Sequence, residues 1–343
     1  MSPTIYDIAK KAKVGIGTVS RVLNNHPSVS AKTRKRVLKI SERLNYNPHP
    51  YARGLARRKT GAVLAIIPYF TTFFFIEILQ AVQSVLSEQD CTLILQGVNH
   101  PDQVEIAWRH HSIQKAVDGV LFFSMNVPNE FQIDHSTSRS PIILVDAQHK
   151  DFDSYSVRNQ SGAFKATTYL LDLGFRKIGM LNANLNSRPA KERFHGYTQA
   201  LTERGIPLRS QYHKHDTSTI LDGFTRESGF RLMQEFISME KEMPEAFFIA
   251  SDIQAIGALN ALREKGIHCP EDVAIIGFDD IDLAEYVQLT TMHQPMSEIG
   301  MMAAKRLLER MSNPSLPIIH ETFEPELVIR TTTRLQEHTV VHL

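Results

Sequence analysis

The stretch TIYDIAKKAKVGIGTVSRVLN at residues 4–24 decides the fold of the N-terminal region. Thr4 with Asp7 three residues later is typical of a helix start, and apolar residues from Ile5 to Ala12 then recur at helical spacing. The pattern therefore predicts a first helix of about nine residues.

A second helix follows after a tight turn. The segment KVGI at residues 13–16 interrupts the first helix, and residues 17–24 resume helical spacing with Val19 and Val22 facing inward. A third amphipathic helix is predicted over residues 30–44, with its apolar face against the first two. Two short helices joined by a tight turn make a helix-turn-helix, so we expect an all-α head.

Charge is distributed unevenly along the chain. Residues 1–60 hold seven Lys and seven Arg against only Asp7 and Glu42, a net charge of +12, whereas the remaining residues hold 24 basic and 35 acidic side chains, a net charge of −11. So large an excess of positive charge in the head favours a polyanion, such as double-stranded DNA, as its partner.

From residue 62 onward, short apolar runs alternate with amphipathic helical patterns. Such alternation predicts parallel sheets covered on both faces, arranged in two lobes with a cleft between them. Ligands of these folds sit beyond the carboxyl ends of the strands. We expect strands at residues 62–67, 92–95, 119–123, 141–146, 177–181, 246–250 and 273–277, and helices at 75–87, 190–203 and 253–265.

The head resembles the headpiece of the lactose-repressor/galactose-repressor (LacI/GalR) family of bacterial transcriptional regulators. The matching motifs are TIYDIA at 4–9, TVSRVLN at 18–24 and VSAKTR at 29–34, followed in the body by ASDIQAIG at 250–257 and PEDVAIIGFDD at 270–280. The resemblance implies an α/β fold in which a helix-turn-helix headpiece precedes a two-lobed, periplasmic-binding-protein-like domain of doubly wound parallel sheets. It also implies a sequence-specific repressor whose operator affinity is controlled allosterically by a small effector.

The resemblance divides the chain into a DNA-binding headpiece at 1–47, a hinge helix and linker at 48–60, and an effector-binding and dimerisation domain at 61–343. By composition, the second part would equally suit a plain basic linker. The spacing of Ala52 and Leu55 between arginines favours a short helix instead. We therefore expect a homodimer that binds operator DNA and a carbohydrate-like effector, without a cofactor.

The resemblance also assigns residues to the DNA. In the family the second helix enters the major groove, and an Arg such as Arg21 can bond guanine O6 and N7 together. The hinge is expected to place Ala52 and Leu55 in the minor groove. The expected contacts in the headpiece are Thr4, Ile16, Gly17, Thr18, Ser20, Arg21 and Asn24.

The resemblance also implies which residues of this chain contact the effector, and these residues lie at strand ends and on the facing helices. Carboxylates and an Arg beside aromatic rings suit the hydroxyls and apolar ring faces of a sugar. Tyr69 and Thr72 stand where Asp and Asn are frequent, and Arg158 stands where an Asp is common. These departures predict a pocket that is more apolar on one side and more basic on another, which favours an aryl glycoside, an acidic sugar or a phosphorylated ligand. The expected effector contacts are Phe74, Phe123, Asp146, Arg193, Phe224, Asp252 and Asp279.

A nucleotide- or sugar-dependent enzyme is the alternative, because doubly wound sheets also occur in enzymes. No Gly-x-Gly-x-x-Gly follows a strand, and no Gly-x-x-x-x-Gly-Lys-Ser/Thr occurs, so we expect a protein without enzymatic activity. No run of about 18 apolar residues is present, and the first residues lack the pattern of a signal peptide. We therefore expect a cytoplasmic protein with no membrane partner.

Two further patterns have an ordinary and a functional interpretation. His213 and His215 at strand spacing, followed by Asp216, could share a metal, but we expect solvent-exposed histidines because no further ligand has recognisable spacing. Cys91 and Cys269 have no partner motif and are expected to be small buried residues. No metal site is therefore predicted.

Overall fold

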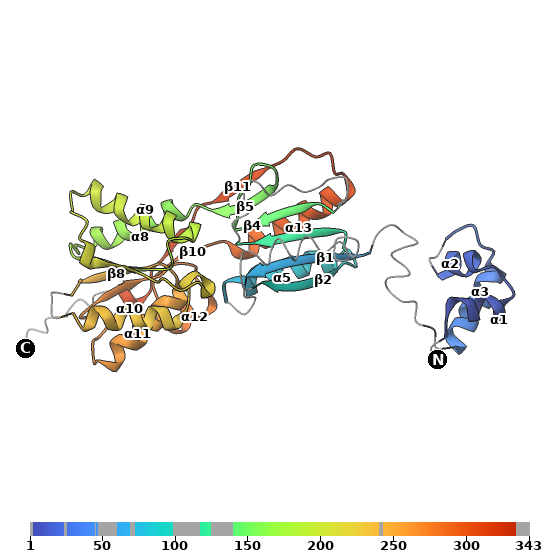
Figure 1. The fold of residues 1–343 in the computed structure, drawn as a ribbon, viewed down its shortest axis with the longest axis horizontal. Coiled ribbons are helices and arrows are strands. Elements are labelled where there is room, and N and C mark those ends of the chain that lie inside the picture. Colours follow the sequence, from blue (N-terminus) through green and yellow to red (C-terminus); the bar gives the residue numbers. More distant parts are fainter. Residues whose placement is uncertain are drawn as a thin grey trace, which may run out of the picture.

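The chain forms a helical head and two α/β lobes (Figure 1). The expected contacts Asn24, Ala52 and Leu55, most of the hinge and the C-terminal tail lie outside the described residues. The computed structural model describes residues 3–23, 26–44, 46, 60–68, 73–98, 117–124, 140–239 and 243–333.

The head consists of α1 (Ile5–Ala12), α2 (Ile16–Leu23) and α3 (Ala31–Arg43). Asp7 supports the start of α1, since its carboxylate accepts the Thr4 backbone N–H at 2.8 Å and the Thr4 hydroxyl at 2.7 Å. The predicted three-helix head is therefore confirmed. Its fully packed apolar residues are Ile8, Ala9, Ala12, Val19, Val22 and Val37.

The first lobe is built on a parallel six-stranded sheet in the order β11-β5-β4-β3-β1-β2. Helices α5 and α13 pack together on one face of it. Gly300 permits this close packing, because a Cβ there would lie 2.5 Å from the carbonyl oxygen of Ile78. The elements are β1 (Ala62–Pro68), α5 (Phe73–Ser87), β2 (Thr92–Val98), β3 (Gly119–Phe123), β4 (Ile142–Val145), β5 (Asp153–Val157), α13 (Met296–Ser312) and β11 (His320–Phe323).

The second lobe has a parallel four-stranded sheet in the order β7-β6-β8-β9. Helices α8 and α9 pack on one face and α10 and α11 on the other. Strands β10 and β12 form a separate antiparallel pair. The elements are α8 (Asn159–Asp172), β6 (Ile178–Asn182), α9 (Arg188–Glu203), η1 (Ser210–Tyr212), β7 (His213–His215), η2 (Ile220–Gly223), α10 (Arg226–Ile237), β8 (Ala246–Ile249), α11 (Asp252–Glu264), β9 (Ala274–Ile276), α12 (Asp282–Tyr286), β10 (Thr291–His293), β12 (Glu326–Val328) and η3 (Thr331–Thr333).

Within the described residues the chain passes between the lobes at three places. These are residues 157–159, between β5 and α8, residues 294–296, between β10 and α13, and residues 323–326, between β11 and β12. The first and third crossings are bonded to each other, since the Arg158 N–H donates to the carbonyl oxygen of Phe323 at 2.9 Å. The two lobes are therefore joined by neighbouring segments of backbone.

The predicted alternation of strands and helices is confirmed in both lobes, but two side-chain expectations are wrong. His213 and His215 are half-buried, because their rings pack 5.1 and 5.7 Å from the ring of Phe194 on α9. This burial lowers the pKa of both histidines. Cys91 and Cys269 are only partly buried, although burial still raises the pKa of Cys269 to about 12.

Two general features of the described part of the chain bear on function. None of its helices combines the length and the apolar content that crossing a membrane requires. No group of three or more His, Cys, Asp or Glu side chains in this part is arranged to hold a metal ion.

Candidate functional site

Helix α2 presents a distinctive outer surface on the head. Val19 and Val22 are buried, whereas Ile16 is 42% exposed and Gly17 and Arg21 are exposed beside it. A Cβ at Gly17 would lie 3.8 Å from Arg21 Nη2, so the Arg21 side chain lies next to this glycine. Gly17 therefore adds no side chain beside the Arg21 guanidinium.

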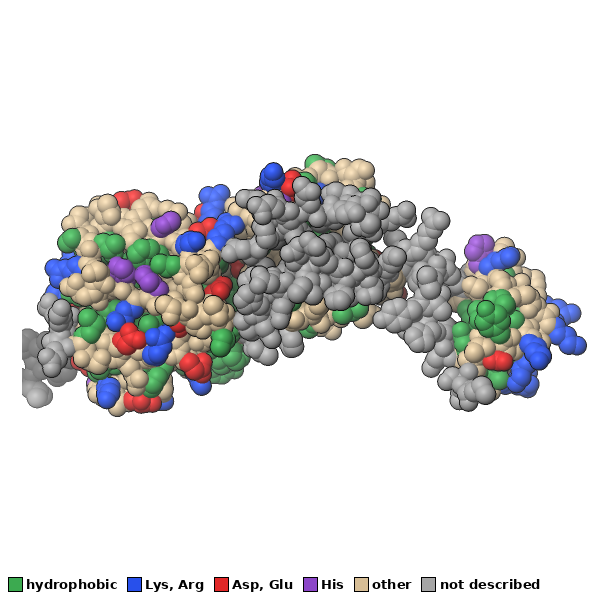
Figure 2. Space-filling model, viewed as in Figure 1, with side chains coloured by type: hydrophobic (Ala, Val, Ile, Leu, Met, Phe, Trp, Pro, Cys, Tyr) green, Lys and Arg blue, Asp and Glu red, His purple; other side chains and the backbone are tan. Residues whose placement is uncertain are grey.

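The other described head residues that were expected at DNA lie around this surface. Thr18 and Ser20 are half-buried on α2, and Thr4 is exposed at the start of α1. Figure 2 shows Lys and Arg side chains gathered along one side of the head. A protein that binds in the major groove requires a helix with an exposed side chain for the bases and basic side chains for the phosphates. The head has both.

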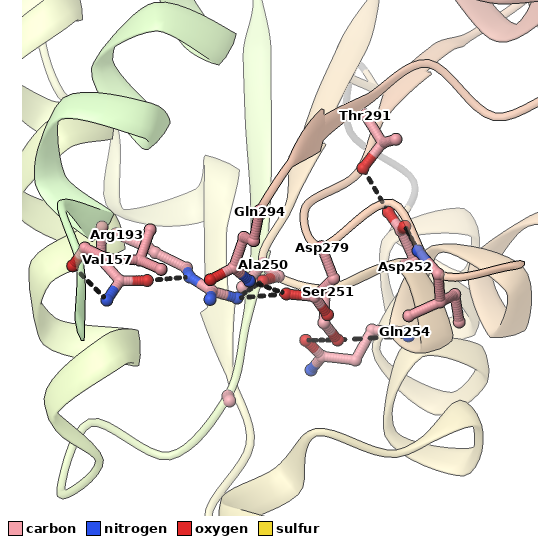
Figure 3. A network of polar contacts seen from close by, with 12 residues as sticks. Val157, Arg193, Ala250, Ser251, Asp252, Gln254, Asp279, Thr291 and Gln294 are labelled. Atoms are coloured by element: carbon pink, nitrogen blue, oxygen red, sulfur yellow. Dashed lines mark hydrogen bonds and ion pairs between the residues drawn. The ribbon is translucent and has the colours of Figure 1, made fainter. Parts of the chain in front are cut away.

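In the second lobe, Arg193 of α9 is the centre of a buried polar network (Figure 3). Only 4% of its surface is exposed. Its Nε donates to Asn159 Oδ1 at 2.9 Å, and Nη1 donates to the Ala250 carbonyl oxygen and lies 3.4 Å from Asp279 Oδ1. The guanidinium carbon stands 3.8 Å from the centre of the Phe278 ring. These contacts offset the cost of burying the cation.

Asp279 follows β9 and provides the opposite charge. Its Oδ1 accepts Gln294 Nε2 at 2.6 Å, and its φ of +122° is one that residues with a side chain rarely adopt. Burial raises the pKa of Asp279 to about 7, although Arg193 and the Gln294 bond act to lower it. Gln294 is fully buried, and its Oε1 has no partner among the described residues. An amide can either donate or accept, so Gln294 suits both protonation states of Asp279 once its amide turns.

Asp252, the first residue of α11, is fully buried behind this network. Its Oδ1 accepts the Thr291 hydroxyl at 2.6 Å and its Oδ2 accepts the Ile281 N–H at 3.1 Å. Gly277 makes room for the carboxylate, because a Cβ there would lie 2.2 Å from Asp252 Oδ1. Burial, together with the charge of Asp279, holds the pKa of Asp252 well above its usual range. Both oxygens of Asp252 are thus engaged within the protein.

Asp146 lies in the first lobe, just after β4, and its charge interacts with residues of the second lobe. The Ser124 hydroxyl donates to Asp146 Oδ2 at 2.6 Å. Burial raises the pKa of Asp146, while the Ser124 bond and the charges of Arg193 and Arg188 lower it. Arg188 also donates to Gln148 Oε1 at 2.8 Å, which joins the two lobes directly. The carboxyl ends of strands from both lobes therefore converge here.

The three expected phenylalanines lie in different environments. Phe224 is half-buried, and the Arg193 guanidinium carbon lies 5.6 Å from its ring centre. Phe74 is also half-buried and packs edge-on against Phe75 at 5.1 Å. Phe123 is fully buried in the core of the first lobe, 6.1 Å from the same ring. Phe224 is therefore the one of the three that touches the Arg193 network.

Arg158, which the sequence predicts on a more basic side of the pocket, is engaged by residues of the neighbouring lobe crossing. Its side chain is 59% exposed, lies 3.3 Å from Glu324 Oε1 and donates to the Thr322 hydroxyl at 3.2 Å. The physical reason is the adjacent lobe crossing, which brings Glu324 within reach. Sequence reasoning also missed Asn159, Gln294 and Ser124, which position the predicted charges.

The arrangement combines a cation, carboxylates and an aromatic face at the ends of parallel strands. Within the described residues, Arg193 Nη2 has no hydrogen-bond partner and is available as a donor. Asp146 and Asp279 are available as acceptors, and the Phe224 ring offers an apolar face. Such a set binds a polar molecule with apolar faces.

Comparison with known proteins identifies relatives for both parts of the chain. Residues 4–49 match the family model described as bacterial regulatory proteins, lacI family, and residues 167–333 match the periplasmic binding protein-like domain. The HTH-type transcriptional repressor CytR of Escherichia coli (strain K12) is 32% identical over 96% of this chain and 96% of its own length.

Solved structures agree with these matches. The lac repressor dimer bound to operator and the anti-inducer ONPF has a TM-score of 0.82 at 24% identity, covering 97% of this chain and 99% of that one. The complex of the transcriptional regulator CelR with cellobiose has a TM-score of 0.69 at 26% identity, covering 96% and 99%. The fold expected from the sequence is confirmed along nearly the whole chain.

Replacement of Asp279 by Asn should make the stability of the protein less dependent on pH. The pKa of Asp279 is 3.8 in the unfolded chain and about 7 in the folded one, so its contribution to stability is present at low pH and is lost as the pH rises between these values. We expect wild type to lose about 2–4 kcal/mol more than Asp279→Asn across this window.

Urea unfolding followed by circular dichroism at several pH values from 4 to 8 measures this difference. Glu88→Gln removes an exposed carboxylate just after α5 and should follow the wild-type curve. Parallel curves for wild type and Asp279→Asn would show that Asp279 stays ionised over the whole range.

Proposed function

We propose that this chain, which belongs to the lacI family of bacterial regulatory proteins, acts as a homodimer on an operator under the control of a sugar or sugar derivative. Members of the family are DNA-binding transcriptional repressors that small effectors control, and they are not enzymes. The observation that carries the proposal is the surface of α2, where Ile16, Gly17 and Arg21 are exposed on one helix. Action on operator DNA implies a cytoplasmic protein.

The proposed reading of DNA rests on the head. Arg21 would bond a guanine in the major groove, and Ile16 would contact a thymine methyl group, since an aliphatic side chain has no hydrogen bond to offer. Thr4, Thr18, Ser20 and Asn24 would position the head at phosphates. Ala52 and Leu55 of the hinge at 48–60 would enter the minor groove, as the resemblance of the sequence suggests.

The proposed effector contacts are those around Arg193. Asp146, Arg193 and Asp279 would bond hydroxyl groups, and Phe224 and Phe74 would pack on the ring faces. Phe123 and Asp252 would support the site from behind, because both are fully buried. A carbohydrate is the favoured class, since the related CelR is described in complex with cellobiose.

A homodimer is supported by the exposed edge of the first lobe. Among the described strands, β2 is the last of the sheet, and its Ile94 and Leu95 are 38% and 46% exposed. On the neighbouring α5, Phe73 and Ile76 are 43% and 41% exposed. Exposed apolar side chains on an edge strand are typical of an interaction surface. A dimer also suits the proposed function, because two copies of the head match a near-palindromic operator.

Replacement of Arg21 by Ala should weaken operator binding and relax base preference at one position in each half-site. Loss of a bidentate guanine contact costs about 1–3 kcal/mol per base. A duplex selected from a random library by the wild-type protein, and its single-base variants, would be titrated by fluorescence anisotropy. Lys39→Ala, an exposed cation on α3, serves as control and should keep the base preference. Unchanged preference in Arg21→Ala would mean that Arg21 does not read a base.

A sugar that binds the Arg193 network should raise the melting temperature of wild type and bind Phe224→Ala at least about tenfold more weakly. The panel is cellobiose, ribose and glucose 6-phosphate, measured by thermal shift and then by calorimetry. Phe194→Ala is the matched control, because Phe194 is a partly buried ring of the same lobe that packs on His213 and His215. Equal loss in both variants, or no response to any sugar, would contradict the proposed effector site.

Replacement of Leu95 by Lys should convert the dimer to monomers at micromolar concentration, because it places a charge in the proposed apolar interface. Light scattering gives the molar mass directly. Leu173→Lys, at a leucine that is 41% exposed on the second lobe, should leave the dimer intact. A Leu95→Lys protein that remains dimeric would exclude the β2 edge as the interface.

A further inference from the structure

The carboxylate of Asp118 holds the backbone at the start of the first lobe. Its Oδ1 accepts the Thr60 N–H at 2.8 Å and its Oδ2 accepts the Gly61 N–H at 2.7 Å. The backbone N–H of Asp118 donates in turn to the carbonyl oxygen of Ala62 at 2.8 Å. Three hydrogen bonds thus join one residue before β3 to three consecutive residues at the start of β1.

This contact is placed where the linker from the head reaches the body. Thr60 and Gly61 are the first described residues after position 46. Gly61 has a φ of +68°, so the chain turns here in a conformation that glycine adopts readily, and its carbonyl oxygen accepts the Thr92 N–H at 2.8 Å. The two residues are therefore bonded to β2 through Thr92 and to β3 through Asp118.

A carboxylate that accepts two backbone N–H groups is a strong and directional anchor, because both bonds are charge-assisted. Neither N–H takes part in the pairing of β1 with β2 or β3, which begins at Ala62 and Val63. Without Asp118 the sheet would keep its register, but the two residues before it would lose their acceptor. The contact fixes where the linker leaves the body rather than the body itself.

We propose that Asp118 is a positioning residue for operator binding, which fixes the point and direction at which the linker leaves the first lobe. This inference rests on the proposed function, in which two heads must bind one operator at a set spacing. Binding of the second head depends on an effective concentration that falls when the connection to the body is less well defined. Asp118 therefore contributes to operator affinity without contacting DNA.

The strand that follows Asp118 also reaches the effector site. β3 begins at Gly119 and ends at Phe123, and the next residue, Ser124, donates to Asp146 at 2.6 Å. The linker anchor and an expected effector contact thus lie at opposite ends of one central strand. A shift of β3 that accompanies effector binding would be passed directly to Thr60 and Gly61.

The test uses the full-length chain and the duplex that wild type selects from a random library. Asp118→Asn keeps the size of the side chain but leaves one N–H without an acceptor, and Asp118→Ala removes both acceptors. We expect operator affinity to fall by about threefold in Asp118→Asn and about tenfold in Asp118→Ala. Binding to an unselected duplex of the same length should change less than twofold, because the head itself is intact.

Limited trypsin digestion distinguishes a local change at the linker from a general loss of stability. Thr60 is the residue after Lys59, so its release from Asp118 should make cleavage after Lys59 faster in both variants, in the same order as the loss of affinity. Cleavage after Lys177 and Lys265 in the second lobe should keep its wild-type rate. Asp151→Asn, an exposed carboxylate of the same lobe, is the control for charge and should behave as wild type.

The outcomes separate this inference from the proposed function. If wild type selects no duplex, the proposed function fails. If wild type binds its duplex and both Asp118 variants bind it equally well, with unchanged cleavage after Lys59, then Asp118 does not position the linker. If affinity falls only as far as the unfolded fraction seen by circular dichroism, Asp118 is merely structural and the inference is wrong.

Discussion

The second lobe depends on the burial of one cation. Removing the Arg193 guanidinium from water costs several kcal/mol, and its partners must offset that cost with good geometry. They come from α8, from the end of β8 and from the segment after β9, and the Phe278 ring covers one face of the guanidinium. Because displacement of any partner leaves a buried charge unpaired, these elements have little freedom relative to one another. The same requirement brings together residues that are far apart in the sequence.

The parts of the fold that could be predicted are those with long, regular patterns. The apolar runs of β1, β3 and β8 bury nearly every residue, and a fully buried parallel strand has this signature. Strands β7 and β10, which were not predicted, have only three residues each, too few to establish a period. Gln294 was missed for this reason, because it follows β10. The head was predictable because its three helices pack through contacts between neighbours in sequence.

For the candidate site, the sequence predicted which residues lie together but not which of their polar atoms are already hydrogen-bonded within the protein. Arg193, Asp279 and Phe224 were expected together and lie together. Asp252 satisfies the same strand-end rule, yet both of its oxygens bond Thr291 and Ile281. Which lone pairs remain available depends on backbone N–H groups from distant segments, and no pattern in a single sequence encodes their positions. The charge asymmetry between head and body, in contrast, follows from composition alone.

The three crossings between the lobes restrict how the body can move. Arg158 and Phe323 are bonded across two of them, and Glu324 adds an ion pair to Lys165 at 3.0 Å. Linked in this way, parallel segments resist sliding and stretching, and what they permit most easily is rotation about an axis through them. The relative motion of the lobes is then close to a single angular coordinate. A small molecule bound between the lobes, beside the crossings that contain Asn159 and Gln294, need set only one angle, and rotation through this angle displaces the outer end of each lobe the most.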